Sequence, residues 1–309
     1  MNRLIAYAVT LLLGAAWVGH VAGNAWDGPA AQAEAARSAP RPPRIVSASL
    51  STDEIALGLV APTRLAAISY FADDPAASNV LGHTHEVRGR VTASVEELVS
   101  LEPTLVLADP FGHMASEGLT RRLGIPIVRT QVVTDLGDVL TNIHTIGRAL
   151  DANREADALV ASLRDRMAAV EARVHGSARP RVLVLYGRGF TVGTGTLVND
   201  LLTRANAENV AALAGVVGHE EMSVERALAL DPDVLVVSDY HADGHARDVR
   251  APPEATDHPV WQNLRAVHEG RIVRMAPADL FTTSQYAVRA LERLAAALHP
   301  QDGAPAERP

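Results

Sequence analysis

A 14-residue segment that occurs twice, about 129 positions apart, constrains the fold more than any other feature of this chain. Residues 94–107 read SVEELVSLEPTLVL, and residues 223–236 read SVERALALDPDVLV. Each copy predicts a short helix, a turn marked by proline and a buried strand. A unit repeated at this distance indicates two lobes built on one plan. The cleft between two such lobes is where a ligand is expected to bind.

The composition excludes several classes of function. A chain of 309 residues allows roughly two domains with ample core. The formal net charge of −8 argues against nucleic acid as the partner. The chain has no cysteine, so disulfides, thiolate metal sites, cysteine nucleophiles and a lipidated cysteine anchor are not expected.

The amino terminus has the pattern of a secretory signal. Arg3 precedes an apolar stretch over residues 4–18, and small residues follow. This stretch is shorter than the roughly 20 residues that a spanning helix needs. We expect a signal peptide over residues 1–25, with cleavage possible as late as residue 33, and a flexible leader over residues 26–43. The mature protein would then be periplasmic or otherwise secreted, and not a Cys-anchored lipoprotein.

The first half alternates strand and helix signals. Apolar runs predict strands at 44–48, 65–69, 105–108 and 124–128, and a Ser-Thr-Asp-Glu sequence at 51–54 predicts a capped helix start. The segment after residue 69 is interpreted as a loop. Alternating strands and helices indicate parallel βαβ units. Residues 44–134 are therefore expected to form an N-terminal lobe.

The middle of the chain has only a helical signal. Between residues 135 and 174 apolar residues recur at helical spacing, and Asp151-Ala152-Asn153 interrupts them. The pattern predicts one helix, a turn, and a longer helix of about 20 residues, or about 30 Å at 1.5 Å per residue. We expect residues 135–175 to be a helical backbone joining two lobes.

The second half begins like the first. The sequence PRVLVL at 180–185 echoes PRIV at 43–46, and further strands are predicted at 234–237 and 270–274. Helices are predicted at 196–204 and 287–298. Residues 176–300 would form a C-terminal lobe with the same order of parts as the first, and residues 301–309 a disordered tail. The predicted fold is α/β, with two similar lobes and mainly parallel sheets joined by a long backbone helix.

Together these segments resemble a known family. The order and spacing of RIVSASLSTDEIALGL, SYFADDP, the two repeat copies, the helical backbone and HPVWQNLRAVHEGRIVRM are similar to class III periplasmic binding proteins of the metal-chelate group. That group comprises receptors for vitamin B12, iron siderophores and haem. The resemblance implies a monomeric binding component of an ABC transporter that delivers the chelate to a permease dimer at the inner membrane. It implies no catalytic residue and no cofactor of the protein's own.

Two loops resemble those of the vitamin B12 (cobalamin) receptors in particular. The loop at 69–75 is similar to their tyrosine-bearing cleft loop. The segment Asp279-Leu280-Phe281 resembles their Asp-Trp-Phe segment, with Leu280 in place of the tryptophan. Tyr70 and Phe281 are therefore candidates to stack on a planar ligand.

Candidate binding residues are expected where strands end. In a doubly wound sheet the cleft lies at the carboxyl ends of strands, and large chelates are held by aromatic faces and a few polar anchors. Histidine or tyrosine can also ligate a bound metal, and arginine can meet a ligand carboxylate. Whether any side chain here ligates the metal directly stays open. The candidates are Tyr70, Phe71, Phe111, His113, Tyr186, Arg188, Tyr240, His241 and Phe281.

Glycines flank Arg188, but they match neither a dinucleotide fingerprint nor a phosphate-binding loop, and they are interpreted as backbone turns. Trp261 is expected to be a packing residue. The resemblance also implies that one surface glutamate on each lobe docks on the permease. Glu117 and Glu254 are the candidates.

Two alternatives compete with chelate binding. A receptor for free zinc or manganese would need about three histidines and a carboxylate in the cleft. An exported enzyme of similar architecture would need a catalytic motif, but the sequence has neither H-E-x-x-H nor G-x-S-x-G.

Overall fold

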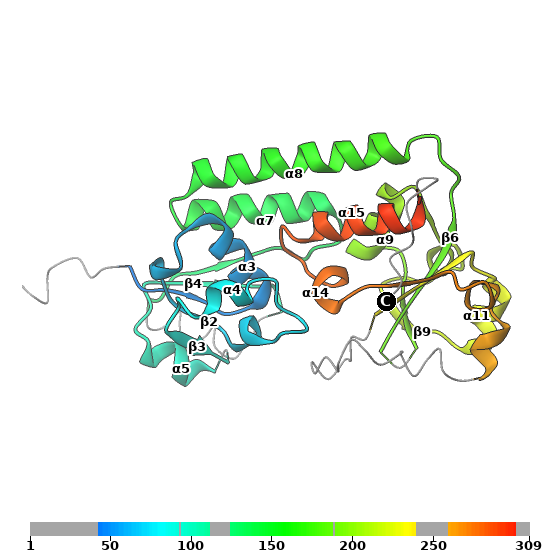
Figure 1. Ribbon diagram of the computed structural model, residues 1–309. Helices are drawn as coiled ribbons and strands as arrows, with labels where there is room; N and C mark the ends of the chain where they lie inside the picture. Colours follow the sequence, from blue (N-terminus) through cyan, green and yellow to red (C-terminus); the bar gives the residue numbers. More distant parts are fainter. Residues whose placement is uncertain (1–42, 93, 112–123, 188, 239–258, 301–309) are drawn as a thin grey trace, which may run out of the picture. The chain divides into compact units, whose positions relative to one another are not determined.

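The computed structural model describes residues 43–92, 94–111, 124–187, 189–238 and 259–300 (Figure 1). Contacts divide the chain into two units, residues 1–42 and 43–309, and all the described residues belong to the second. The expected signal peptide, all but the last residue of the leader, and the carboxyl-terminal tail therefore lie outside the described residues. None of the described helices combines the length and the apolar character needed to cross a membrane.

The first sheet consists of five strands in the order β3-β2-β1-β4-β5, and all of its pairings are parallel. Its strands are β1 (Ile45–Ser47), β2 (Leu65–Ser69), β3 (Gly89–Val91), β4 (Leu105–Ala108) and β5 (Ile127–Arg129). The helical segments among them are α3 (Leu50–Leu59), η1 (Pro62–Arg64), η2 (Tyr70–Asp73), α4 (Leu81–Thr84) and α5 (Val95–Ser100). The loop predicted after residue 69 thus contains two helical segments and the edge strand β3.

Two helices come next, as the sequence predicts: α7 (Leu136–Ala149) and the 22-residue α8 (Asn153–Val174). A capping box starts α7, because the carboxylates of Asp135 and Asp138 each accept the other residue's backbone N–H. Asp151 turns the chain between the helices with a φ of 54°. At Gly147 a Cβ atom would lie 2.5 Å from that of Ala156, so glycine lets the two helices pack closely.

The second sheet has six strands, in the order β11-β10-β6-β7-β9 with β8 beside β6. The strands are β6 (Arg181–Tyr186), β7 (Phe190–Val192), β8 (Glu208–Asn209), β9 (His219–Glu221), β10 (Val234–Ser238) and β11 (Ile272–Arg274). The helical segments are α9 (Leu197–Arg204), α10 (Val210–Leu213), α11 (Val224–Leu230), η3 (Pro259–Asn263), α13 (Arg265–His268), α14 (Pro277–Leu280) and α15 (Ala287–Leu298).

The two halves differ in one respect that was not expected from the sequence. In the second half β7 runs antiparallel to both β6 and β9, so the expectation of an identical order of parts is wrong. The reversal from β6 to β7 depends on Gly187 and Gly189, whose φ values are 53° and 99°. The interpretation of these glycines as backbone turns is confirmed, and the α/β class with mainly parallel sheets is confirmed.

The repeated segment forms the same structure in both halves. Ser94 and Ser223 cap their helices by accepting the N–H of Glu97 and Arg226, respectively. At the carboxyl end of each helix an acidic residue at the equivalent position takes a left-handed conformation, with a φ of 44° at position 102 and of 41° at position 231. Both copies therefore begin and end their helix in the same way.

Each copy also fixes the start of its central strand. The backbone N–H of Arg44 donates to Thr104 Oγ1 at 2.9 Å, and that of Arg181 donates to Asp233 Oδ2 at 2.9 Å. The repeat therefore helps to set the pairing of β1 with β4 and of β6 with β10.

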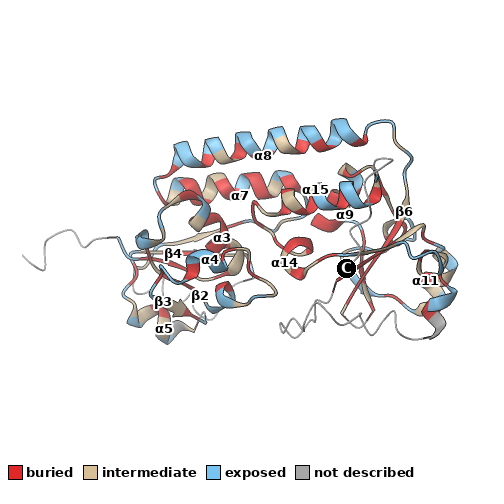
Figure 2. Cartoon of the chain, viewed as in Figure 1, coloured by how far each residue is buried: buried red, intermediate tan, exposed pale blue. Residues whose placement is uncertain are grey.

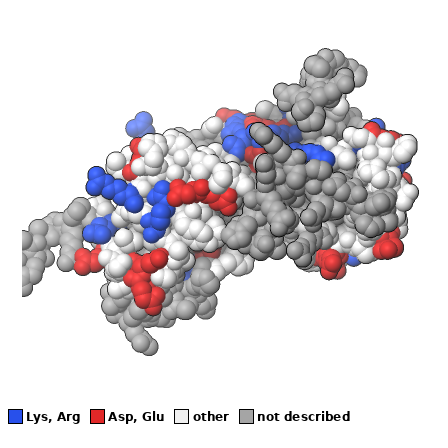
Figure 3. All heavy atoms as spheres, turned by 60° about the horizontal axis from the view of Figure 1, so that its bottom comes forward, with Lys and Arg blue, Asp and Glu red and all other residues white. Residues whose placement is uncertain are grey.

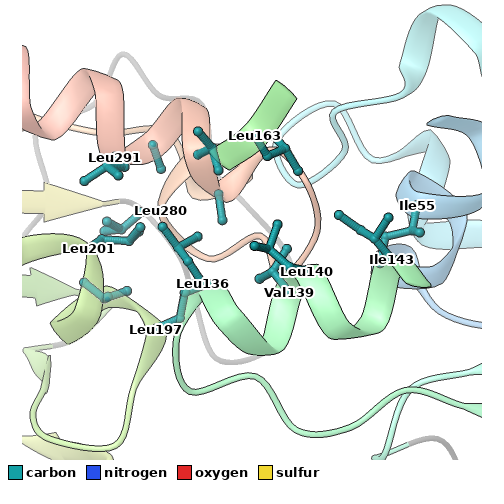
Figure 4. Close-up of a cluster of buried hydrophobic side chains, with 14 of the residues drawn as sticks. Ile55, Leu136, Val139, Leu140, Ile143, Leu163, Leu197, Leu201, Leu280 and Leu291 are labelled. Carbon is teal, nitrogen blue, oxygen red and sulfur yellow. The ribbon is translucent and has the colours of Figure 1, made fainter. Parts of the chain in front are cut away.

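One hydrophobic core includes side chains from both sheets and from the helices between them. Figure 4 shows some of its members on the helices. Ile55 on α3, Ile143 on α7 and Leu201 on α9 are fully buried in it. Figure 2 shows α8 with exposed residues on one side and buried residues on the other. Because burying such a side chain contributes about 1.5–3 kcal/mol, this shared core joins the two halves strongly.

Candidate ligand-binding cleft

Two adjoining cavities lie at the carboxyl ends of the central strands. The larger measures about 680 Å³ and the smaller about 470 Å³. The two cavities share six of their lining residues, which are Ser51, Asp109, Phe111, Phe281, Thr282 and Thr283. The cavities therefore form one cleft with two chambers, of a size suited to a large organic ligand.

The larger cavity, which we call the aromatic chamber, has a wall built on Tyr186, the last residue of β6. The ring of Tyr186 lies 4.9 Å from that of Phe281 and 5.9 Å from that of Phe190, between centroids. Tyr186 is only 7% exposed, and its hydroxyl lies 2.7 Å from His219 Nδ1. Packing and this hydrogen bond together hold the wall in one arrangement.

His219 belongs to the same wall. It lies on β9, opposite Val192 of β7, and its ring meets that of Tyr186 edge-on at 5.9 Å. His219 as a whole is exposed, but partial loss of water around its ring lowers the pKa of the imidazole below its usual value. A lowered pKa favours the neutral imidazole, in which one ring nitrogen is a donor and the other an acceptor.

The smaller cavity, which we call the hydroxyl chamber, is polar on one side. The serines and threonines that line it are Ser49, Ser51, Ser69, Thr92, Thr282 and Thr283. Tyr70 and Phe71 line it as well, with ring centroids 4.0 Å apart, and they are 46% and 37% exposed. Phe111, which belongs to both chambers, is 80% exposed.

An ion pair fixes the segment that carries Tyr70 and Phe71. Arg90 on β3 donates through Nε and Nη2 to the two carboxylate oxygens of Asp73, at 2.5 and 2.9 Å. The guanidinium lowers the pKa of the Asp73 carboxyl, so the pair stays charged at neutral pH. This two-pronged contact anchors η2 to the edge of the first sheet.

Glu54 joins the two sides of the cleft. Its carboxylate accepts hydrogen bonds from the backbone and side-chain nitrogens of Asn79, both at 2.9 Å, and from the hydroxyls of Thr282 and Ser284. Burial raises the pKa of the Glu54 carboxyl, and these four donors oppose the rise. Glu54 is 1% exposed and its carboxylate accepts four hydrogen bonds. Its role is therefore structural, because it links α3 to the segment before α15.

The preceding residue, Asp53, is completely buried. Burial raises the pKa of its carboxyl to about 7, although both oxygens accept the N–H of Ser69 at 3.1 and 3.2 Å. The expectation that the Ser-Thr-Asp-Glu sequence caps a helix starting at residue 51 is wrong. The helix α3 starts at Leu50, and its N-cap residue Ser49 makes no side-chain cap.

Five of the candidate residues line the cleft, and their role in binding stays a prediction. These are Tyr70, Phe71, Phe111, Tyr186 and Phe281. The candidates outside the described residues are His113, Glu117, Arg188, Tyr240, His241 and Glu254. Trp261 is 4% exposed within the core of the second sheet, which confirms it as a packing residue.

His219 lines the cleft but is not among the nine candidate binding residues named from the sequence. The signal was weak, because β9 has only three residues, all of them polar and exposed.

The described lining of the cleft carries two carboxylates, those of Glu54 and Asp109, and no arginine or lysine side chain. On the face shown in Figure 3, acidic and basic residues are interspersed. Among the residues that the structure describes, no three histidine or acidic side chains are grouped closely enough to hold a metal ion.

The chain belongs to the periplasmic binding protein family, which its residues 45–278 match. Members of this family are binding proteins that act outside the cytoplasm. A cobalamin-binding protein of Halobacterium salinarum is 31% identical over 67% of this chain and 56% of its own length. A vitamin B12-binding protein of Yersinia pseudotuberculosis is 27% identical, over 63% of this chain and 69% of its own length. This chain thus spans little more than half of the first of these relatives.

Solved structures share the fold. A periplasmic heme-binding protein, RhuT, from Roseiflexus sp. RS-1 in its apo form superposes with a TM-score of 0.71 at 25% identity, covering 82% of this chain and 97% of that one. A periplasmic heme binding protein from Pseudomonas aeruginosa gives a TM-score of 0.68 at 22% identity, covering 84% and 94%. The second likeness concerns the fold alone.

Proposed function

We propose that this protein is the extracytoplasmic substrate-binding component of an ABC transporter, and that it captures a metal chelate in the two-chambered cleft and delivers it to a permease. Membership of the family and the names of its relatives support this proposal. So does the cleft, which combines aromatic walls with a few polar groups, as large organic ligands require.

Within that class we propose a corrinoid, the cobalt macrocycle of cobalamin, as the ligand. The observation that carries the choice is the charge of the described lining, which holds two carboxylates and hydroxyl groups but no cationic side chain. Haem carries two carboxylates, and many ferric siderophores are anionic. Proteins characteristically bind such ligands through arginine side chains, which pair with their negative charges. A corrinoid with uncharged amide side chains suits the serine and threonine hydroxyls of the hydroxyl chamber.

Calorimetric titration of the purified protein with cyanocobalamin, haemin and a ferric catecholate siderophore tests this choice. Cyanocobalamin should bind most tightly of the three. Tighter binding of haemin or of the siderophore would refute the corrinoid assignment while leaving chelate binding intact. Binding of none of them would refute the proposed function itself.

Docking on a permease is a separate proposal, resting on Glu117 and Glu254. Charge reversal at Glu117 should leave chelate affinity unchanged and reduce transport, because rim charges govern encounter and register more than affinity. Uptake of labelled ligand by cells that carry Glu117→Arg is the measurement. Normal uptake would show that Glu117 does not take part in docking.

A further inference from the structure

We propose that His219 Nε2 binds an axial coordination position of the metal in the bound chelate. The inference rests on the proposed function and concerns those bound chelates whose metal has an exchangeable axial ligand. His219 is one of the residues that line the aromatic chamber, together with apolar residues such as Phe190, Leu197 and Phe281.

The hydrogen bond to Tyr186 prepares the histidine for this role. Histidine ligands of metals characteristically donate their second ring N–H to a neighbouring oxygen, which fixes the ring and its tautomer. Here Nδ1 lies 2.7 Å from the Tyr186 hydroxyl, and in the tautomer with hydrogen on Nδ1 this nitrogen donates to the tyrosine oxygen. The lone pair of Nε2 is then available, and no described residue is found hydrogen-bonded to that nitrogen.

The surroundings of His219 suit a planar macrocycle. Tyr186 is buried and packs against Phe281 and Phe190, so the residue that orients the imidazole is itself held in place. Imidazole nitrogen is a good ligand for first-row transition metals such as iron and cobalt. In the proposed step one water molecule leaves the cobalt and the Nε2 lone pair replaces it. No electron is transferred, and Nδ1 keeps its hydrogen.

Two corrinoids that differ at the metal provide the test. Diaquocobinamide has exchangeable water at both axial positions, whereas cyanocobalamin has both positions filled by cyanide and its own base. Binding of diaquocobinamide should shift its visible absorption bands to those of an imidazole complex. In His219→Ala this shift should disappear, and affinity for diaquocobinamide should fall at least about tenfold, the lower end of the cost of disturbing a metal ligand's support. Affinity for cyanocobalamin should stay within about twofold.

Further variants complete the design. Free imidazole should restore the absorption shift to His219→Ala, and Tyr186→Phe should keep the shift but weaken diaquocobinamide binding. His268→Ala removes an exposed histidine on α13 that lines neither chamber, and it should match the wild type. Equal losses for both corrinoids in His219→Ala, or an unchanged shift, would overturn the inference while the proposed function stands. If the wild-type protein binds neither corrinoid, the corrinoid assignment fails as well.

Discussion

The two halves of the cleft are built from equivalent strands but present their aromatic rings differently. In the first half Tyr70, Phe71 and Phe111 come after parallel strands and lie 46%, 37% and 80% exposed. In the second half the antiparallel strands β7 and β9 extend the sheet, and Tyr186 is only 7% exposed. One half therefore offers a wall that is already packed, and the other offers rings that a ligand would cover.

The difference shows that two halves with the same strand and turn structure can form cleft walls with different packing. The repeat fixes strand starts and turns alike in both halves, through the bonds from Arg44 to Thr104 and from Arg181 to Asp233. The segments beyond the strand ends are free to diverge. A packed wall loses little conformational freedom on binding, whereas exposed rings gain most of their burial from the ligand.

The largest effect on stability is expected at Glu54, whose hydrogen bonds link the two sides of the cleft. Glu54→Ala should lower the free energy of unfolding by about 3 kcal/mol or more, because it removes the shared acceptor of four hydrogen bonds from Asn79, Thr282 and Ser284, the last two of which are buried. Urea denaturation measures it. Glu54→Gln keeps one carbonyl acceptor and should lose less, and Glu155→Ala, on the exposed side of α8, should change little. A Glu54→Ala protein as stable as the wild type would contradict the fastening role.

Asp53 should make stability depend on pH. Its pKa in the folded protein, about 7, lies above the value of 3.8 expected in the unfolded chain. The folded state therefore binds the proton more tightly, so this residue's contribution to stability is present at low pH and is lost as the pH rises through about 7. Between pH 3.8 and about 7, this residue's contribution to the free energy of unfolding falls by at most about 4 kcal/mol. Each unit of pKa difference corresponds to ~1.4 kcal/mol.

Asp53→Asn should abolish this dependence. Unfolding free energies at about pH 4 and about pH 8 should differ less in the variant than in the wild type, with the variant favoured at the higher pH. The raised pKa of Glu54 is present in both proteins, so only the difference between them is informative. Parallel pH profiles would show that Asp53 is ionised in the folded protein.

The contrast between the two walls can be measured through ligand affinity. Phe281→Ala should weaken corrinoid binding by about 2–3 kcal/mol, since it removes a ring that lines both chambers and packs on Tyr186. Tyr70→Ala should cost about 1 kcal/mol, because that ring lines only one chamber and the cost of ordering it on binding offsets part of what its burial contributes. Leu213→Ala removes an exposed apolar side chain outside both chambers and serves as control. A larger loss of affinity in Tyr70→Ala than in Phe281→Ala would mean that the exposed rings, and not the packed wall, contribute more to binding.

The sequence predicts the scaffold better than the cleft. Hydrophobic periodicity and the repeat predict the strand at 65–69, the strand at 105–108 and the closing helix at 287–298 with the observed bounds. Periodicity cannot report a strand of three polar residues such as β9, so the pattern indicates a loop at His219. Nor can local pattern show that Glu54, near a helix start, reaches Thr282, which lies 228 residues away in the sequence.

The smallest effect tests whether the two repeat copies are energetically equivalent. Ser94→Ala and Ser223→Ala each remove a hydroxyl that accepts a backbone N–H at 3.2 Å at the start of its helix. Such a cap contributes about 1 kcal/mol. The first copy has a second support, because the Glu97 carboxylate also accepts the N–H and hydroxyl of Thr92 at 2.7 Å. Ser94→Ala should therefore lower the midpoint of thermal unfolding less than Ser223→Ala, and equal shifts would mean that this second support does not contribute.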